Sequence, residues 1–327
     1  TFTEQEVEAM ARVLTGWTDT GYQTTDPEEE LTAIFQPDLH DVLPKQLSAR
    51  FGEEVIGDLG EEEYAHLIDV IFVQDVVAQH ICRKLYRWFV YYKIDELTEA
   101  EVILPLAQLL IDNDYEIAPV LQVLLRSNHF YSILNQGPMI KHPIQFVLNP
   151  IRQCGVAFPE EVQEQYPLWY RLHELTDNMD MAYYDIPEVA GWKAYYQQPL
   201  FYRNWINSIS LQQRSRYIRN LVVNGYTPAE VTLRMDPLAF IATLDDPLEP
   251  NAMIAEIVTL LLPQPLEPGQ LTALKEILIP GLPDFEWTLE YGNYLGNPDD
   301  ETTRQAVQSK LQDLFVGLFN MAEFHLS

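Results

Sequence analysis

Apolar residues recur at helical spacing along most of this chain. The first helical stretch follows Thr3 and Glu6, which fit a capping box, and it stops at Gly16. Two further helices are expected from Glu61 onward, on either side of residues 74–75. Others are expected at about 98–111, 116–126, 143–154, 160–176, 208–223, 236–244, 251–262, 268–278, 284–292 and 299–325, with a short one from residue 227. The pattern predicts an all-α fold, a single multi-helical body over residues 1–327 with a soft division near 181–207.

Two stretches break this helical pattern. Residues 18–58 are acidic and rich in turn formers, with extended pieces around 33–36 and 45–51, which leaves room for one small β-hairpin. Residues 183–207 hold eight aromatic residues without helical or strand periodicity. A stretch of that length predicts a long irregular aromatic loop that packing or function must hold in place.

The charge balance excludes some partners. The chain carries 20 basic and 49 acidic residues, a net charge of −29. Nucleic acids and anionic membranes need a basic face, so neither is expected as the main partner. No window is apolar enough for a membrane span, and the opening residues TFTEQEVEAMARVL do not form a signal peptide. Since the chain does not begin with Met, we expect a processed or trimmed form, and an upstream targeting segment stays an open alternative.

Common catalytic and cofactor signatures are missing from the sequence. There is no GxSxG, GxxxxGK, GxGxxG or HExxH, and no two histidines lie three or four residues apart. The two cysteines, Cys82 and Cys154, are expected to be free and buried, and they are too few for a zinc site of cysteines. Acidic clusters at 112–116 and 297–301 lack EF-hand spacing and are better explained as helix caps. We therefore expect no cofactor and no metal.

His40, Asp41 and Lys45 form the first candidate site, in the loop FQPDLHDVLPK. A carboxylate beside an imidazole can orient it, raise its pKa and create a general base or a pair of metal ligands. The alternative is an ordinary turn, because Asp and Pro are good turn formers and Asp–Lys pairs commonly fix loops.

Two basic groups are the other candidates for binding. His80, Arg83, Lys84 and Arg87 share helical faces and could hold an anionic group, although pairing with acids of the same chain is the favoured interpretation. Arginines at 203, 214, 216 and 219 adjoin the aromatic stretch, where they could bind carbohydrate, a carboxylate or a peptide. The candidate binding residues are Trp192, Tyr195, Tyr196, Tyr202, Trp205, Arg203, Arg83, Lys84 and Arg87. The alternative is a core corner that buries the rings.

Several segments taken together resemble one bacterial family, DUF1800. They are TEQEVEAMARVLTGW at 3–17, FQPDLHDVLPK at 35–45, VIFVQDVVAQHICRKLYRWFV at 70–90, YEIAPVLQVLLRSNHFY at 115–131, KHPIQF at 141–146, IPEVAGW at 186–192, WIN at 205–207 and MAEFHLS at 321–327. The resemblance implies a further N-terminal helical region in family members, and we expect this chain to start after it. It also implies export, and a partner from another exported family, DUF1501, whose genes often lie beside those of DUF1800 members.

The resemblance also bears on the candidate residues. The family's HD loop corresponds to His40, Asp41 and Lys45, and its GW…W segment to Gly191, Trp192, Trp205 and Asn207. The chain departs from the family by carrying Leu43–Pro44 where a glycine usually precedes the lysine, and Lys193–Ala194–Tyr195–Tyr196 where a glycine-rich link is usual. These departures put in doubt any function that needs a flexible turn at either place.

We therefore expect a periplasmic or otherwise exported, envelope-associated binding or assembly protein. It would engage a glycan or a partner protein through the aromatic segment, with Trp192 and Trp205 as anchors and Tyr195, Tyr196 and Tyr202 free for contact. The alternative is a hydrolase-like enzyme with His40–Asp41 as base or metal pair and Arg83 or Lys84 as anion stabiliser. A purely structural scaffold is the third possibility.

Overall fold

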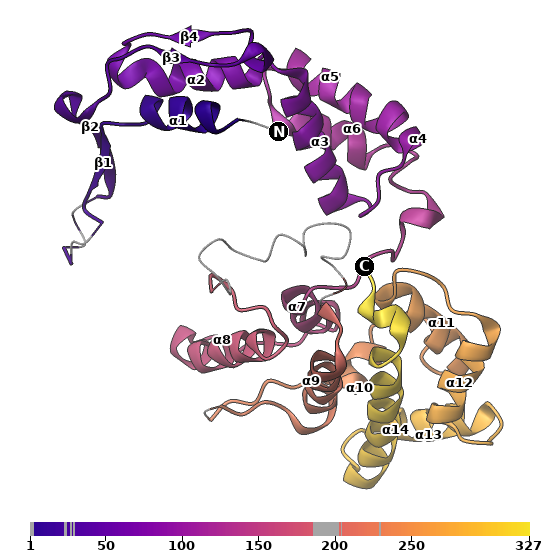
Figure 1. Cartoon of the computed structure of the whole chain (residues 1–327). Coiled ribbons are helices and arrows are strands. Elements are labelled where there is room, and N and C mark those ends of the chain that lie inside the picture. Colours follow the sequence, from indigo (N-terminus) through magenta and orange to yellow (C-terminus); the bar gives the residue numbers. More distant parts are fainter. Residues whose placement is uncertain are drawn as a thin grey trace. The chain divides into compact units, whose positions relative to one another are not determined.

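The computed structural model describes residues 3–22, 25, 26, 28, 30–185, 203, 205–228 and 230–327. Helices dominate, as the sequence predicts (Figure 1). Contacts divide the chain into two compact units, Thr1–Phe130 (unit 1) and Tyr131–Ser327 (unit 2). The predicted soft division near 181–207 lies mostly outside the described residues.

Unit 1 begins with helix α1 and two small hairpins. Its elements are α1 (Glu4–Val13), β1 (Trp17–Thr20), β2 (Thr32–Phe35), β3 (Lys45–Gln46), β4 (Val55–Ile56), α2 (Glu63–Phe72), α3 (Asp75–Phe89), α4 (Glu96–Thr98), α5 (Leu104–Asp112) and α6 (Ile117–Leu125). The capping box predicted at Thr3 and Glu6 is present. Two antiparallel pairs replace the single expected hairpin, β1 with β2 and β3 with β4. Short 3-10 helices at Pro37–Leu39, Ala49–Phe51 and Gly60–Glu62 connect these elements.

Unit 1 has two apolar clusters. One joins α1, the β3–β4 hairpin and α2 through Ala9, Val13, Leu47, Ile56 and Leu67. The other lies between α3, α5 and α6, and its buried members include Ala78, Cys82, Leu110 and Leu124. The first cluster packs α1 against α2, next to the loop that carries His40.

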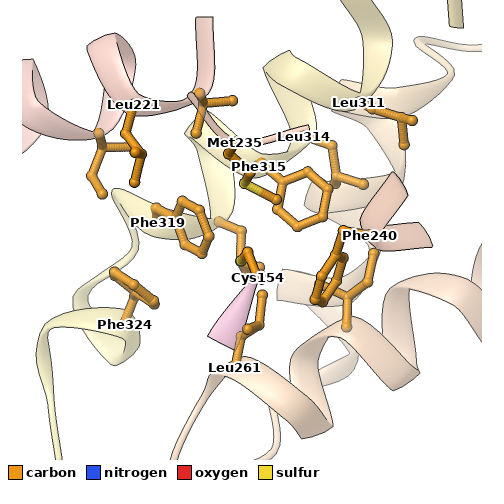
Figure 2. Packing of buried hydrophobic residues seen from close by; sticks show 14 of the residues in the cluster. Cys154, Leu221, Met235, Phe240, Leu261, Leu311, Leu314, Phe315, Phe319 and Phe324 are labelled. Carbon is orange, nitrogen blue, oxygen red and sulfur yellow. The ribbon is translucent and has the colours of Figure 1, made fainter. Parts of the chain in front are cut away.

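Unit 2 is built around its last long helix. Its elements are α7 (Pro143–Gln153), α8 (Val162–Asp177), α9 (Ser208–Arg219), α10 (Pro237–Ile241), α11 (Pro250–Leu261), α12 (Pro268–Leu278), α13 (Phe285–Gly296) and α14 (Glu301–Phe319), followed by a 3-10 turn, Ala322–His325. Helix α14 contacts α9, α10, α12 and α13 (Figure 1). Figure 2 shows Phe315 and Phe319 of this helix in the core with Phe240, Leu261 and Phe324.

Both cysteines are free and buried in these cores, as expected. Burial raises the pKa of Cys82 to about 11 and that of Cys154 to about 12. Thiols in that state are poor nucleophiles and poor metal ligands, so they serve as packing groups. Asp300 caps α14 by accepting a hydrogen bond from the Thr302 amide (3.3 Å), which confirms the capping role expected for that acidic cluster.

Candidate functional site

The loop that carries His40 is shaped by the residues that follow α1. Gly16 has a φ of +89°, a left-handed conformation that favours glycine, and it lets the chain turn from α1 into β1. A side chain at Gly16 would lie 3.1 Å from the Cβ atom of His40. Thr15, just before it, accepts a hydrogen bond from His40 Nδ1 at its carbonyl (2.9 Å) and one from the Asp41 amide at its hydroxyl (2.9 Å). The turn Leu14–Trp17, which we call the LTGW turn, therefore sets the position of the HD loop.

His40 and Lys45 meet on a third residue, Glu63, the first residue of α2. His40 Nε2 lies 3.0 Å from Glu63 Oε1, and Lys45 Nζ lies 2.8 Å from Oε1 and 2.7 Å from Oε2. The side chains are almost fully enclosed, with 2% of His40 and 0% of Lys45 and Glu63 exposed. Lys45 also donates to the Asp41 carbonyl. We call His40, Lys45 and Glu63 the buried triad.

The hydrogen bonds of His40 define its charge. The Thr15 carbonyl can only accept, so Nδ1 carries a proton, and Nε2 faces a carboxylate. Burial opposes the charged imidazole, but the hydrogen bonds to Thr15 and Glu63 outweigh it and raise the pKa of His40. Burial likewise opposes the charged form of Glu63, yet the hydrogen bonds from Lys45 and His40 lower the pKa of its carboxyl. The triad is therefore a carboxylate held between an ammonium group and an imidazole whose protonated form it favours.

Asp41 does not pair with His40 as the sequence suggested. Arg12 of α1 donates to both of its oxygens, from Nε at 2.7 Å and from Nη2 at 3.0 Å. The Arg12 guanidinium, followed by the Leu43 amide, holds the pKa of Asp41 well below its usual range. Arg12 also donates to the carbonyls of Leu43 (3.2 Å) and Pro44 (3.4 Å). The segment in which this chain lacks the usual family glycine is thus clamped to α1.

A metal ion fits this arrangement poorly. Ligand atoms of His40, Asp58 and Glu63 lie within 4.8 Å of one another, close enough to share an ion. Lys45 Nζ, however, contacts both Glu63 oxygens, so a divalent cation would face an ammonium group at van der Waals range. His40 as a general base meets a similar obstacle, because both of its nitrogens have internal partners and its side chain is enclosed. The hydrogen bonds of the buried triad and the Arg12–Asp41 ion pair instead hold α1, the HD loop and α2 together.

The pH dependence of the triad gives a first prediction. The raised pKa of His40 adds stability below its unfolded value near 6.5, and that stability is lost as pH rises through the folded pKa. The lowered pKa of Glu63 adds stability above about 4.5, lost as pH falls through its folded pKa. We therefore expect hydrogen exchange in α1 and α2 to be slowest between about pH 4.5 and 6.5 after correction for intrinsic rates. In His40→Gln the increase in exchange above pH 6.5 should disappear, and its persistence would contradict this assignment.

The basic residues of α3 have separate partners. Arg83 pairs with Glu99, with Nε at 3.0 Å from Oε2, and it also donates to Gln79 (3.2 Å). This pairing within the chain is the one the sequence favoured. Burial, then the neighbouring Arg83 charge, lowers the pKa of half-buried Arg87. Lys84 is exposed, and within the described part of the chain it forms no ion pair.

The described ends of the aromatic segment are fixed to unit 2. Trp205 is buried, with 3% exposed, as expected of an anchor. Asn207 caps α9 by accepting from the amides of Ile209 (2.9 Å) and Ser210 (2.8 Å), and it donates to Asp180 (3.1 Å). Arg203 is exposed. The predicted binding residues Trp192, Tyr195, Tyr196 and Tyr202 lie outside the described residues, so their roles stay predictions.

Two residues of this site, Glu63 and Arg12, were not predicted from the sequence. Glu63 lies in an acidic run with Glu61 and Glu62, which reads as a solvated helix start, but it precedes the buried Leu67 by four residues and so shares its face. Arg12 in the last turn of α1 gave no signal beyond a favourable helix-end charge. The helical spacing from Glu63 to Leu67 could have identified the first, whereas only the tertiary contact identifies the second.

Membrane crossing was tested on the described helices. None of them alone is both long and apolar enough to span a bilayer. The consecutive helices Gly60–Phe72 and Asp75–Phe89 meet those criteria of length and composition only as a pair, and the chain bends by 80° between them.

Comparison with known proteins gives one match. Residues 1–285 match the family DUF1800, described as a protein of unknown function. No curated protein and no solved structure matches the chain. Since the match covers far more than half of the sequence, this chain belongs to the DUF1800 family.

Proposed function

We propose that this protein is an exported, envelope-associated binding or assembly protein that engages a partner protein through an exposed face of α3. That face carries Val76, His80, Lys84 and Trp88 at four-residue intervals, which places them along one side of the helix. We call these four residues the α3 stripe. The observation that carries the proposal is Trp88, whose large side chain is 69% exposed beside Lys84.

An exposed tryptophan is a typical hot-spot residue for protein recognition. Trp residues dominate binding energy in interfaces because they bury a large area and lose few rotamers. A helix face of this kind can present its side chains to a groove or a second helix. Helix α3 packs into the core of unit 1 through its buried residues Ala78, Cys82 and Tyr86. Because this face is fixed, the helix can present the stripe without reorganisation.

The charge of the α3 stripe favours an acidic partner. The chain has a net charge of −29, and the α3 stripe is a basic and aromatic interruption of that acidic surface. A partner with carboxylates around an apolar pocket would be attracted to the stripe and repelled by most other faces. Export to the periplasm or beyond, and a partner from the DUF1501 family, are the expectations that family resemblance adds to this proposal.

The test is binding of a DUF1501-family protein from the same organism, measured by calorimetry with the full chain. Trp88→Ala should weaken binding by roughly 30-fold or more, as for a central interface tryptophan. Lys84→Glu should weaken it further at low salt, because it reverses the charge that faces the partner.

Matched changes elsewhere serve as controls. Trp169 is another exposed tryptophan, in α8, and Lys93 is an exposed lysine beyond the end of α3. Trp169→Ala and Lys93→Glu should leave the affinity within about twofold. Equal losses from the stripe variants and the controls, or no binding by the wild-type chain, would reject the proposal.

The two alternatives from the sequence have different standing. A glycan remains the alternative ligand; its predicted contacts Tyr195, Tyr196 and Tyr202 lie outside the described residues. The hydrolase-like alternative draws no support from the described contacts, since His40 is enclosed and its nitrogens are directed to Thr15 and Glu63. Binding is therefore the function that the described geometry favours.

A further inference from the structure

Unit 2 contains a second group of buried titratable side chains, which come from three distant parts of the chain. Lys141 precedes α7, Arg214 lies in α9, and His325 ends the last 3-10 turn. Their exposed fractions are 3%, 0% and 4%. The C-terminal segment is bound to the start of α7 by the backbone hydrogen bonds from Lys141 N to His325 O (2.8 Å) and from Ser327 N to Met139 O (2.8 Å).

The contacts among the three residues involve few acceptors. Lys141 Nζ donates to the Phe324 carbonyl (2.7 Å), and Arg214 Nη2 donates to the Lys141 carbonyl (2.7 Å). Arg214 Nη1 lies 3.4 Å from His325 Nδ1, which accepts because a guanidinium can only donate. Aromatic rings complete the surroundings: Phe146 lies under the guanidinium (4.4 Å) and Phe324 under Nζ (4.3 Å).

Most donors of this cluster are unused. An ammonium has three N–H groups and a guanidinium five, and the contacts above use one and two of them. Arg214 Nε is buried without any hydrogen-bond partner. Across the described ranges, no carboxylate forms an ion pair with Lys141 or Arg214. Two buried cations that lack a counterion are rare and costly in proteins.

The cost of burying these charges also lowers the pKa values of the three side chains. Burial, with Arg214 nearby, lowers the pKa of Lys141 to about 8, and burial lowers that of Arg214 to about 10. Burial, followed by the charges of Arg214 and Lys141, lowers the pKa of His325 to about 4, so His325 is neutral at pH 7. At neutral pH the cluster therefore carries two positive charges. The cation–π contacts with Phe146 and Phe324 offset part of the cost of these charges but supply no hydrogen-bond acceptors.

We propose that Lys141 and Arg214 form an internal binding site for a phosphate-class oxyanion, taken as the free ion or as the end of a phosphate ester. A dianion matches the two positive charges, and its oxygens supply the acceptors that Arg214 Nε and Lys141 Nζ lack. Arginine's planar fork suits phosphate oxygens, and the rings of Phe146 and Phe324 exclude water from the charges. The site lies wholly within unit 2 and is independent of the α3 stripe.

Thermal unfolding of the full chain at pH 7, with sodium phosphate titrated against sodium chloride of equal ionic strength, tests the site. Phosphate should raise the Tm saturably, whereas chloride should not. Glycerol phosphate is the second probe: a saturable rise with it points to an ester ligand, and a rise with inorganic phosphate alone points to the free ion. A response to acetate equal to that of phosphate would overturn the phosphate class.

Single substitutions test whether the stabilisation by phosphate depends on Arg214 and Lys141. Arg214→Lys keeps the charge but removes the fork and should weaken the apparent affinity for phosphate at least about tenfold. Arg219→Lys, at an exposed position of the same helix, should not change it. If Arg214→Lys does not fold, Lys141→Met should lose the response, because it removes a cation and keeps the volume. An unchanged apparent affinity for phosphate in Arg214→Lys, an unchanged response in Lys141→Met, or no saturable stabilisation of the wild type overturns the proposal.

Discussion

Replacing Glu63 with Gln should destabilise unit 1 by about 3–5 kcal/mol, the cost of leaving a buried charge without its partner. In Glu63→Gln the ammonium of Lys45 and the imidazole of His40 would lie enclosed without the carboxylate that both contact. The loss is a large share of the 5–15 kcal/mol that stabilises an ordinary domain. Hydrogen exchange of α1 and α2 measures it without requiring that the two units unfold together.

Two further measurements separate this effect from a general loss of charge. Glu62 is the exposed neighbour of Glu63, and Glu62→Gln should change stability by no more than about 0.5 kcal/mol. In the double variant Lys45→Met with Glu63→Gln, the loss should be smaller than the sum of the two single losses, since the second change removes the charge that the first left unpaired. Equal effects of Glu62→Gln and Glu63→Gln would show that the triad contributes no net stability.

The helical parts of the fold follow from local features of the sequence. The capping box at Thr3 and Glu6 and the cap at Asp300 each act within three residues, so periodicity and capping rules find them. The β3–β4 hairpin was harder to predict, because its strands have two residues each and depend on contacts with α1 and α2. Strands of that length carry too little pattern to be separated from a loop.

The candidate site was predicted in part. His40 and Lys45 do share one polar centre, but the acid between them is Glu63, which lies 23 residues after His40. Asp41, the neighbour in sequence, is drawn to Arg12 of α1 instead. Sequence adjacency suggested a His–Asp pair, whereas the turn at Thr15 and Gly16 directs the two side chains to different helices. Long-range ion pairing of this kind has no local signature.

Because the triad is enclosed, the HD motif is better explained by a structural role than by a catalytic one. A catalytic histidine needs one nitrogen free for the reacting group, and His40 has none. Its two hydrogen bonds instead link the end of α1, the HD loop and the start of α2, the elements that precede α3 in unit 1. In the proposed function, the motif would act indirectly, by fixing the elements that precede the helix carrying the α3 stripe.

Gly16→Ala should be the second strongly destabilising change, with a loss of about 2–4 kcal/mol in unit 1. An alanine would have to keep a φ of +89°, and its Cβ would lie 2.9 Å from the Phe35 ring and 3.0 Å from the Gln36 carbonyl oxygen. Both belong to the chain that leads into the HD loop, so the loop must shift. The Thr15–His40 hydrogen bond should weaken, and the pKa of His40 should fall, which NMR titration of the imidazole signals would record.

Gly52 is the matched control for this prediction, because it separates backbone strain from steric conflict. Gly52 also has a left-handed φ, +67°, but a Cβ there would meet no atom within 4 Å. Gly52→Ala should therefore cost only the backbone term, about 1–2 kcal/mol, and leave the His40 titration unchanged. The difference between the two variants measures how tightly the LTGW turn is packed against His40. Identical losses, with the same His40 pKa in both, would mean that Gly16 serves the turn alone and does not position the triad.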